Sequence, residues 1–268
     1  MLVGLISCRS AIAQSEDHSQ TFDTFADWCA HQAQLTPAAS HTVDVLLAQA
    51  ETQDCEQAEA TLSSLTELSL DEVDIIDVAP LASLTQLTGL SLSNNAIVET
   101  TPLANLTNLI WLSLGNNEIA NVASLENLTN LIVLQLGGNE IADVAPLARL
   151  SNLIILELGS NAIADVAPLA SLTSLTRLQL GRNEIANLAP LADLNNLVWL
   201  SLGRNEIADV APLANLTNLE ELSLSNNVIA DATPLVRLTN LAYLNLKGNP
   251  LSDLTCPVEP QTVCKGLI

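Results

Sequence analysis

Few residues of the kinds that carry out catalysis occur in this chain, and they are not grouped. The three histidines, His18, His31 and His41, all precede residue 65, and there is neither a phosphate-binding loop nor a Cys and His cluster with zinc spacing. Acid-base or metal-assisted catalysis needs such groups to converge on one place. We therefore expect a protein that is not an enzyme and that uses no cofactor.

Acidic and amide side chains recur at one position every 22 residues. The series contains Asp143, Asp165, Asp209, Asp231 and Asp253, with Asn121 and Asn187 at the same position in other units. Stacked carboxylates can bind calcium, but Asn interrupts the series, and Asp and Asn are also the residues that cap helical turns. We predict that this column caps a turn and binds no metal.

A second column, also spaced by 22 residues, holds the large side chains that are typical of binding surfaces. Every aromatic residue between 65 and 250 falls in it, together with one arginine. Trp, Tyr and Arg are frequent anchors of protein interfaces. We predict that the ligand-binding residues are Trp111, Val133, Ile155, Arg177, Trp199, Glu221 and Tyr243. The alternative is that these neighbouring side chains only pack against one another.

These columns arise from a unit of 22 residues that recurs without insertion from Leu65 to Leu241. Each unit begins Leu-x-x-Leu-x-Leu-x-x-Asn-x-Ile and ends Pro-Leu-x-x-Leu, which is a leucine-rich repeat pattern. Leucines that alternate with outward residues predict a short strand with one buried face. The Pro-Leu-x-x-Leu half predicts tight helical turns. Stacking predicts an α/β solenoid with a parallel concave β-sheet and short 3-10 or helical turns on its convex side.

An asparagine occupies the ninth position of eight successive units. The residues are Asn95, Asn117, Asn139, Asn161, Asn183, Asn205, Asn227 and Asn249. A side-chain amide there can bond both donors and acceptors of the bending backbone. We predict a structural hydrogen-bond ladder along the solenoid rather than a ligand site.

The unit, with Ile at position 11 and Pro-Leu at positions 16 and 17, resembles the repeats of the internalin class of leucine-rich repeat proteins. The resemblance covers the chain from Leu65 to about Leu251. The end segments, Trp28-Cys29 with Asp54-Cys55 and Cys256-Pro257 with Cys264, are similar to those of internalin-like proteins from cyanobacteria.

Outside the repeats the sequence predicts an export signal and two caps. We expect a signal peptide over residues 1–13 and a helical N-terminal cap over 14–64, with one helix beginning at Thr36-Pro37. Nine repeat units follow over 65–250, and a short C-terminal cap occupies 251–268. The alternative to plain cleavage is a lipid anchor on Cys8.

Four cysteines flank the repeats, with Cys29 and Cys55 before them and Cys256 and Cys264 after them. Two pairs outside a solenoid indicate one disulfide in each cap, which implies an oxidising compartment. The alternative is four reduced, buried thiols.

The formal net charge of -22 repels phosphate backbones, and no apolar run is long enough for a membrane-spanning helix. We therefore expect an exported monomer, in the periplasm, at the cell surface or secreted, with neither a nucleic acid partner nor a membrane span. Its concave face is expected to bind a protein. A carbohydrate-binding or envelope-structural role is the alternative, and an intracellular scaffold similar to phosphatase regulators is a third.

Overall fold

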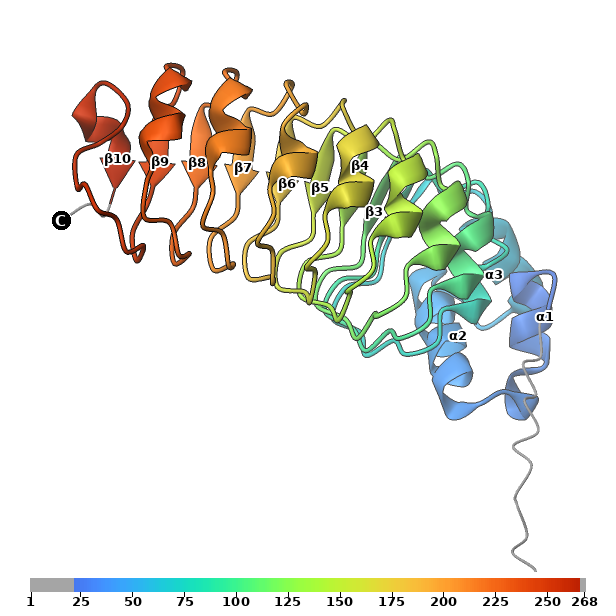
Figure 1. Ribbon diagram of the computed structural model, residues 1–268. Coiled ribbons are helices and arrows are strands. Elements are labelled where there is room, and N and C mark those ends of the chain that lie inside the picture. Colours follow the sequence, from blue (N-terminus) through green and yellow to red (C-terminus); the bar gives the residue numbers. More distant parts are fainter. Residues whose placement is uncertain (1–21, 266–268) are drawn as a thin grey trace, which may run out of the picture.

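The computed structural model describes residues 22–265, so the predicted signal peptide and Cys8 lie outside the described residues. Within this range ten parallel strands form one sheet and follow one another in chain order. Figure 1 shows these strands along an arc, with helices at its N-terminal end. The predicted α/β solenoid is confirmed.

Each repeat contributes a strand of three residues, which occupies positions 3 to 5 of the unit. The strands are β1 (Glu67–Ser69), β2 (Gly89–Ser91), β3 (Trp111–Ser113), β4 (Val133–Gln135), β5 (Ile155–Glu157), β6 (Arg177–Gln179), β7 (Trp199–Ser201), β8 (Glu221–Ser223) and β9 (Tyr243–Asn245). The leucines at positions 4 and 6 point into the core, as Leu156 and Leu158 do, both 0% exposed. Equal positions pair across neighbouring strands, so each position of the unit becomes one column of the sheet.

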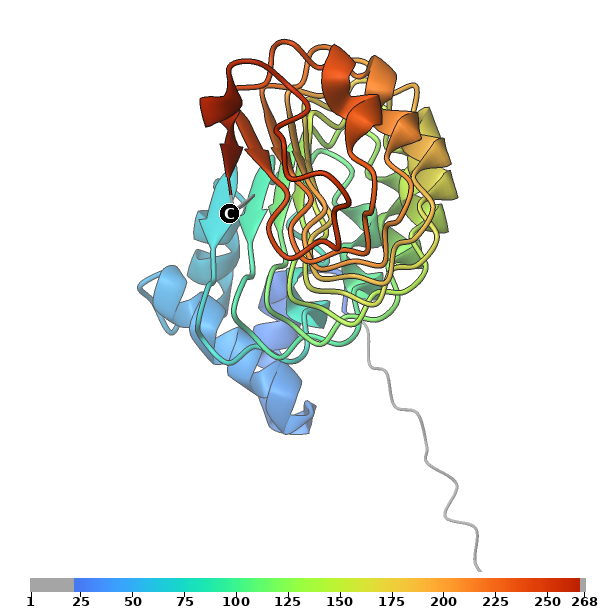
Figure 2. The same ribbon diagram turned by 60° about the vertical axis from the view of Figure 1, so that its left-hand side comes forward.

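Short 3-10 helices lie opposite the strands, as the Pro-Leu-x-x-Leu pattern predicts (Figure 2). They are η2 (Ala79–Leu81), η3 (Thr101–Asn105), η4 (Ala123–Asn127), η5 (Ala145–Arg149), η6 (Ala167–Ser171), η7 (Ala189–Leu191), η8 (Ala211–Asn215) and η9 (Thr233–Arg237). Strands pack about 4.8 Å apart, whereas helices with side chains are about 10 Å wide. The array therefore curves, and the sheet takes the concave side.

The asparagine ladder is present as predicted. In a representative repeat, Asn183 Nδ2 donates to the carbonyl oxygens of Leu158 and Leu180, each at 3.0 Å. Its Oδ1 accepts from the backbone N–H of Ile163 at 3.0 Å. Each amide thus satisfies three buried backbone groups and ties one repeat to the preceding one.

The predicted capping role of the Asp and Asn column is also confirmed. Asp143 Oδ1 accepts from the backbone N–H of Ala145 at 2.8 Å, and Asn121 makes the equivalent bond to Ala123 at 2.9 Å. In the last such turn before the cap, the Thr233 hydroxyl and N–H donate to Asp231 and hold the pKa of its carboxyl below the ordinary value. Across residues 22–265, no three His, Cys, Asp or Glu side chains are grouped so as to hold a metal ion.

The N-terminal cap is helical, as predicted. It contains α1 (Phe25–Ala30), η1 (Gln32–Gln34), α2 (Pro37–Gln49) and α3 (Cys55–Leu62). Helix α2 begins after Thr36, whose hydroxyl accepts from the Ala39 N–H at 3.1 Å. A disulfide between Cys29 and Cys55 joins α1 to α3. None of the helices in the described part of the chain is long and apolar enough to cross a membrane.

The C-terminal cap continues the sheet, which the sequence did not predict. Its elements are η10 (Gln261–Val263) and β10 (Cys264–Lys265). Cys264 lies opposite Leu244 of β9 and is bonded to Cys256. The cap thereby pairs the backbone edge of β9 in addition to covering the last repeat.

Because both disulfides lie in the caps, reduction should loosen the two ends of the solenoid before its middle. Closing loops of these lengths contributes about 3.5 kcal/mol for Cys29–Cys55 and about 2.5 kcal/mol for Cys256–Cys264. Hydrogen exchange followed by mass spectrometry, with and without reductant, measures the order of opening. A non-reduced peptide map of protein from an oxidising compartment serves as the check, and four free thiols would contradict the assignment.

Candidate functional site

The structure places the seven predicted binding residues side by side on the concave face. All occupy the first position of a strand, and neighbours pair directly in register, as Arg177 does with Trp199. Five are half-buried, namely Trp111, Val133, Ile155, Trp199 and Tyr243, while Arg177 and Glu221 are exposed. The register therefore brings them together in one outward column, as the sequence predicts.

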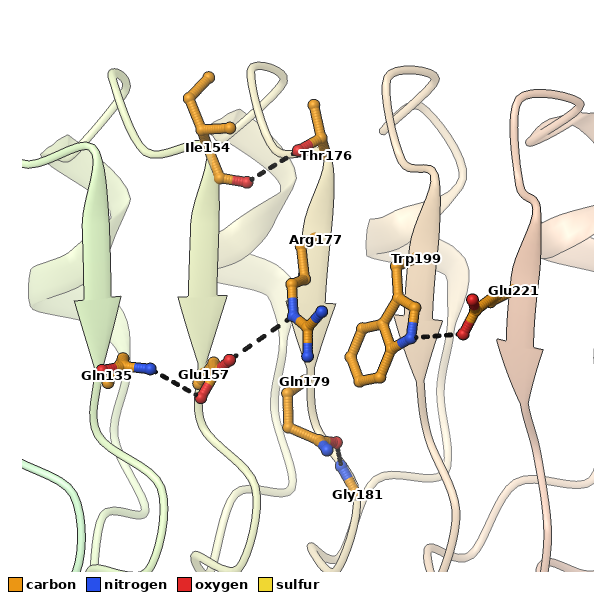
Figure 3. Close-up of polar contacts among 9 residues, drawn as sticks. All are labelled: Gln135, Ile154, Glu157, Thr176, Arg177, Gln179, Gly181, Trp199 and Glu221. Carbon is orange, nitrogen blue, oxygen red and sulfur yellow. Dashed lines mark hydrogen bonds and ion pairs between the residues drawn. The ribbon is translucent and has the colours of Figure 1, made fainter.

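Five side chains in consecutive repeats form a chain of polar contacts across this face, which we call the polar ladder (Figure 3). Gln135 Nε2 donates to Glu157 Oε2 at 3.2 Å, and Glu157 Oε1 lies 3.5 Å from Arg177 Nε. The Arg177 guanidinium lies over the Trp199 ring, 4.1 Å from its centroid. Trp199 Nε1 then donates to Glu221 Oε2 at 2.9 Å.

The polar ladder changes the interpretation of two predicted anchors. Arg177 covers one face of the Trp199 ring, and a cation-π contact at an exposed site is worth about 0.5–1 kcal/mol. Packing between neighbouring side chains, the alternative considered from the sequence, therefore occurs at Arg177 and Trp199. These contacts also hold both side chains in fixed orientations before any ligand arrives.

Three adjacent repeats carry an apolar patch, of which the predicted binding column includes only Trp111, Val133 and Ile155. Position 2, at the edge of the sheet where the strands begin, is occupied by isoleucines that are 45% exposed at Ile110 and 41% exposed at Ile132. We define the apolar patch as Ile110, Trp111, Ile132, Val133, Ile154 and Ile155. The signal was present in the sequence, because the flanking units have Thr88 and Thr176 at position 2.

Beyond the column, a groove of about 570 Å³ runs along the concave face from the unit of Ser93 to that of Ser225. Its lining comes from positions 5, 7 and 8 of the units and is rich in Ser and Gly. A Cβ atom on Gly159 would lie 3.2 Å from the carbonyl oxygen of Gly181 and 3.0 Å from Gln179 Cγ. A side chain there would need its neighbours to shift by a few tenths of an ångström, so glycine suits the narrow spacing of the repeats and leaves the groove open to backbone and hydroxyl contacts.

A family model described as Leucine Rich repeats (2 copies) matches residues 107–149, 151–193, 195–237 and 217–257. Among curated proteins no match was found.

Solved structures resemble the chain over most of its length. An internalin (inlF) from Listeria monocytogenes is 30% identical, with a TM-score of 0.68 over 83% of this chain and 72% of that one. Internalin C2 from the same organism is 35% identical, with a TM-score of 0.71 over 79% of this chain and 93% of that one.

The ectodomain of the plant receptor kinase GASSHO1/SCHENGEN3 from Arabidopsis thaliana is 27% identical, with a TM-score of 0.61 over 70% of this chain and 25% of that one. The similarity of the end segments to cyanobacterial proteins stays a prediction. On the family match and the two internalin structures, the chain belongs to the leucine-rich repeat family and is internalin-like in its repeats.

Proposed function

We propose that this chain is an exported, non-catalytic module that recognises a protein partner through its concave face. The observation that carries the proposal is the apolar patch. Its isoleucines Ile110 and Ile132 are exposed to solvent and are not part of the buried core. Contiguous exposed apolar side chains on a solvated surface mark interaction sites. The two disulfides support export, because such bonds persist in oxidising compartments.

The size of the face suits a macromolecule. From Trp111 to Tyr243 the column crosses six strand spacings, which is about 29 Å. Support for a protein ligand also comes from the plant receptor ectodomain, which was solved in complex with CASPARIAN STRIP INTEGRITY FACTOR 2.

A carbohydrate ligand, the alternative, is less well supported by the side chains on this face. Sugar rings stack on open aromatic faces, but Arg177 already covers one face of Trp199. Most of the apolar patch is aliphatic and offers no flat ring. A glycan array probed with the full chain would decide in favour of the alternative if a glycan bound through Trp111 and no protein partner were found.

Crosslinking and mass spectrometry in the native envelope should identify the partner, and Trp111→Ala should then weaken its binding by about 2 kcal/mol or more. Affinity is measured by surface plasmon resonance on the full chain. Ile110→Ala should weaken binding too, whereas Val236→Ala, an equally simple truncation of an exposed aliphatic residue on the convex side, should not. If Trp111→Ala and Trp199→Ala both bind as tightly as the unaltered protein, the concave face is not the binding site.

A further inference from the structure

Two arginines line the groove at a backbone position that does not favour arginine. Position 8 of every unit has a positive φ, which is 58° at Arg182 and 60° at Arg204. Left-handed backbone of this kind favours Gly and Asn, and it is unfavourable for long side chains. The other seven units hold Asn three times, Gly twice, and Glu72 and Ser160 once each. Arginine in two adjacent units is therefore a departure that the fold does not require.

Among residues 22–265, neither arginine is neutralised by a neighbour. In the part of the chain that the structure describes, their guanidinium groups form no ion pair and no hydrogen bond, although Arg177 and Arg149 each pair with a glutamate. The flanking residues of the same column, Ser160 and Asn226, are uncharged. Two like charges one strand spacing apart, about 4.8 Å, repel each other unless an anion lies between or beside them. In a chain of net charge -22, Arg182 and Arg204 thus offer two adjacent positive charges that no ion pair among residues 22–265 takes up.

The surroundings of the pair fit a carboxylate-bearing chain. Guanidinium groups bind carboxylates with two parallel hydrogen bonds. Ser201 and Ser223, which line the same groove, offer hydroxyl groups to the polar backbone of such a chain. The apolar patch is centred on β4, two to three strand spacings from the arginine pair, which is about 12 Å along the array. The patch also lies at positions 2 and 3 of the unit and the arginines at position 8, so the separation reaches about 20 Å.

We infer that the groove holds an acidic segment of an extended polypeptide, with its carboxylates on Arg182 and Arg204 and an apolar residue on the apolar patch. The inference rests on the proposed function and names the chemistry of the partner. An extended chain rises about 3.3 Å per residue, so about four to six residues separate the apolar residue from the carboxylates.

A polypeptide fits this face better than other anionic polymers do. Glu157 lines the groove and Glu221 lies in the same polar ladder, so a polyphosphate chain with a charge on every unit would be repelled where it passes these carboxylates. An acidic glycan supplies carboxylates but no aliphatic side chains for Ile110 and Ile132. A peptide with few carboxylates and an adjacent apolar residue satisfies both regions.

The test uses fluorescein-labelled peptides in which leucines and glutamates are separated by about four to six residues, made in both chain directions, with Gln-for-Glu counterparts. Fluorescence anisotropy on the full chain should show one direction binding at least about tenfold more tightly with Glu than with Gln. The double variant Arg182→Asn, Arg204→Asn should lose that difference. Asn already occupies this position in other units, so thermal melting should show an unchanged or more stable fold. Arg149→Asn with Arg237→Asn, on the convex side, should leave binding intact.

Equal binding of the Glu and Gln peptides, equal binding by the double variant, or no binding of either peptide overturns the inference. Arginine-dependent binding of short polyphosphate or oligogalacturonate without peptide binding overturns it as well, because the groove then takes another polymer. Failure here is distinguishable from failure of the proposed function. If the crosslinked partner is lost on Trp111→Ala but retained by the double arginine variant, the concave face binds a protein and the arginines do not hold its carboxylates.

Discussion

Replacing Leu200 by alanine should lower the free energy of unfolding by about 2–5 kcal/mol, whereas Trp199→Ala should lower it by about 1 kcal/mol or less. Leu200 is 1% exposed and lies in β7 between Leu178 and Leu222 of the adjacent strands. Its truncation removes transfer free energy and leaves a cavity that the stacked repeats cannot close. Trp199 sits one residue earlier on the outward face and is half-buried, so its truncation removes the Arg177 stack and the Glu221 hydrogen bond but opens no cavity in the core.

Urea unfolding followed by circular dichroism measures both variants. Repeat arrays do not always unfold in a single transition, so the slope of each curve must be compared with that of the unaltered chain. A loss of stability for Trp199→Ala as large as that for Leu200→Ala would show that the tryptophan supports the fold. It would contradict the prediction that Trp199 is a binding residue.

Asn183→Ala should lower the free energy of unfolding by about 3–5 kcal/mol, because it leaves three backbone groups of two repeats without partners. The side chain is 9% exposed, and its amide bonds the carbonyl oxygens of Leu158 and Leu180 and the N–H of Ile163. Water cannot readily replace it at that depth. The loss should be localised, with hydrogen exchange rising first at Ile163.

The matched control is Asn196→Ala in the same unit. Asn196 is exposed and donates a single hydrogen bond, 2.8 Å to the carbonyl oxygen of Thr173, so its removal should cost about 1 kcal/mol or less. Comparable losses for Asn183 and Asn196 would contradict the structural role assigned to the buried ladder.

Most of the fold could be predicted from the sequence because the solenoid is built by repetition. A period of 22 residues fixes which leucines face inward, and pairing of equal positions follows from it without further information. Strand β10 could not be predicted, because Cys256 stands where the repeat has Pro and the pattern stops there. Pairing of Cys264 with Leu244 is a backbone contact, and it leaves no trace in side-chain periodicity.

The candidate site was predictable in outline only. The column that holds Trp111 and Trp199 follows from the register, but the stacking of Arg177 on Trp199 depends on side-chain conformations that spacing does not determine. The groove depends on how closely repeats approach at their glycines. The sequence contains Arg182 and Arg204 at equal positions of adjacent units. That arginine is unusual at this position becomes clear only from the positive φ of the backbone there.

Because the units have one length, the distance between the apolar patch and the arginine pair can change only in fixed steps. Because each unit adds one strand in strict register, duplication or deletion of a whole unit between β5 and β6 would shift the apolar patch relative to the arginine pair by one strand spacing, about 4.8 Å. No side chain at either region would need to change. Gene-level gain or loss of a repeat is thus a route by which related chains can select ligands that differ in length by one or two residues.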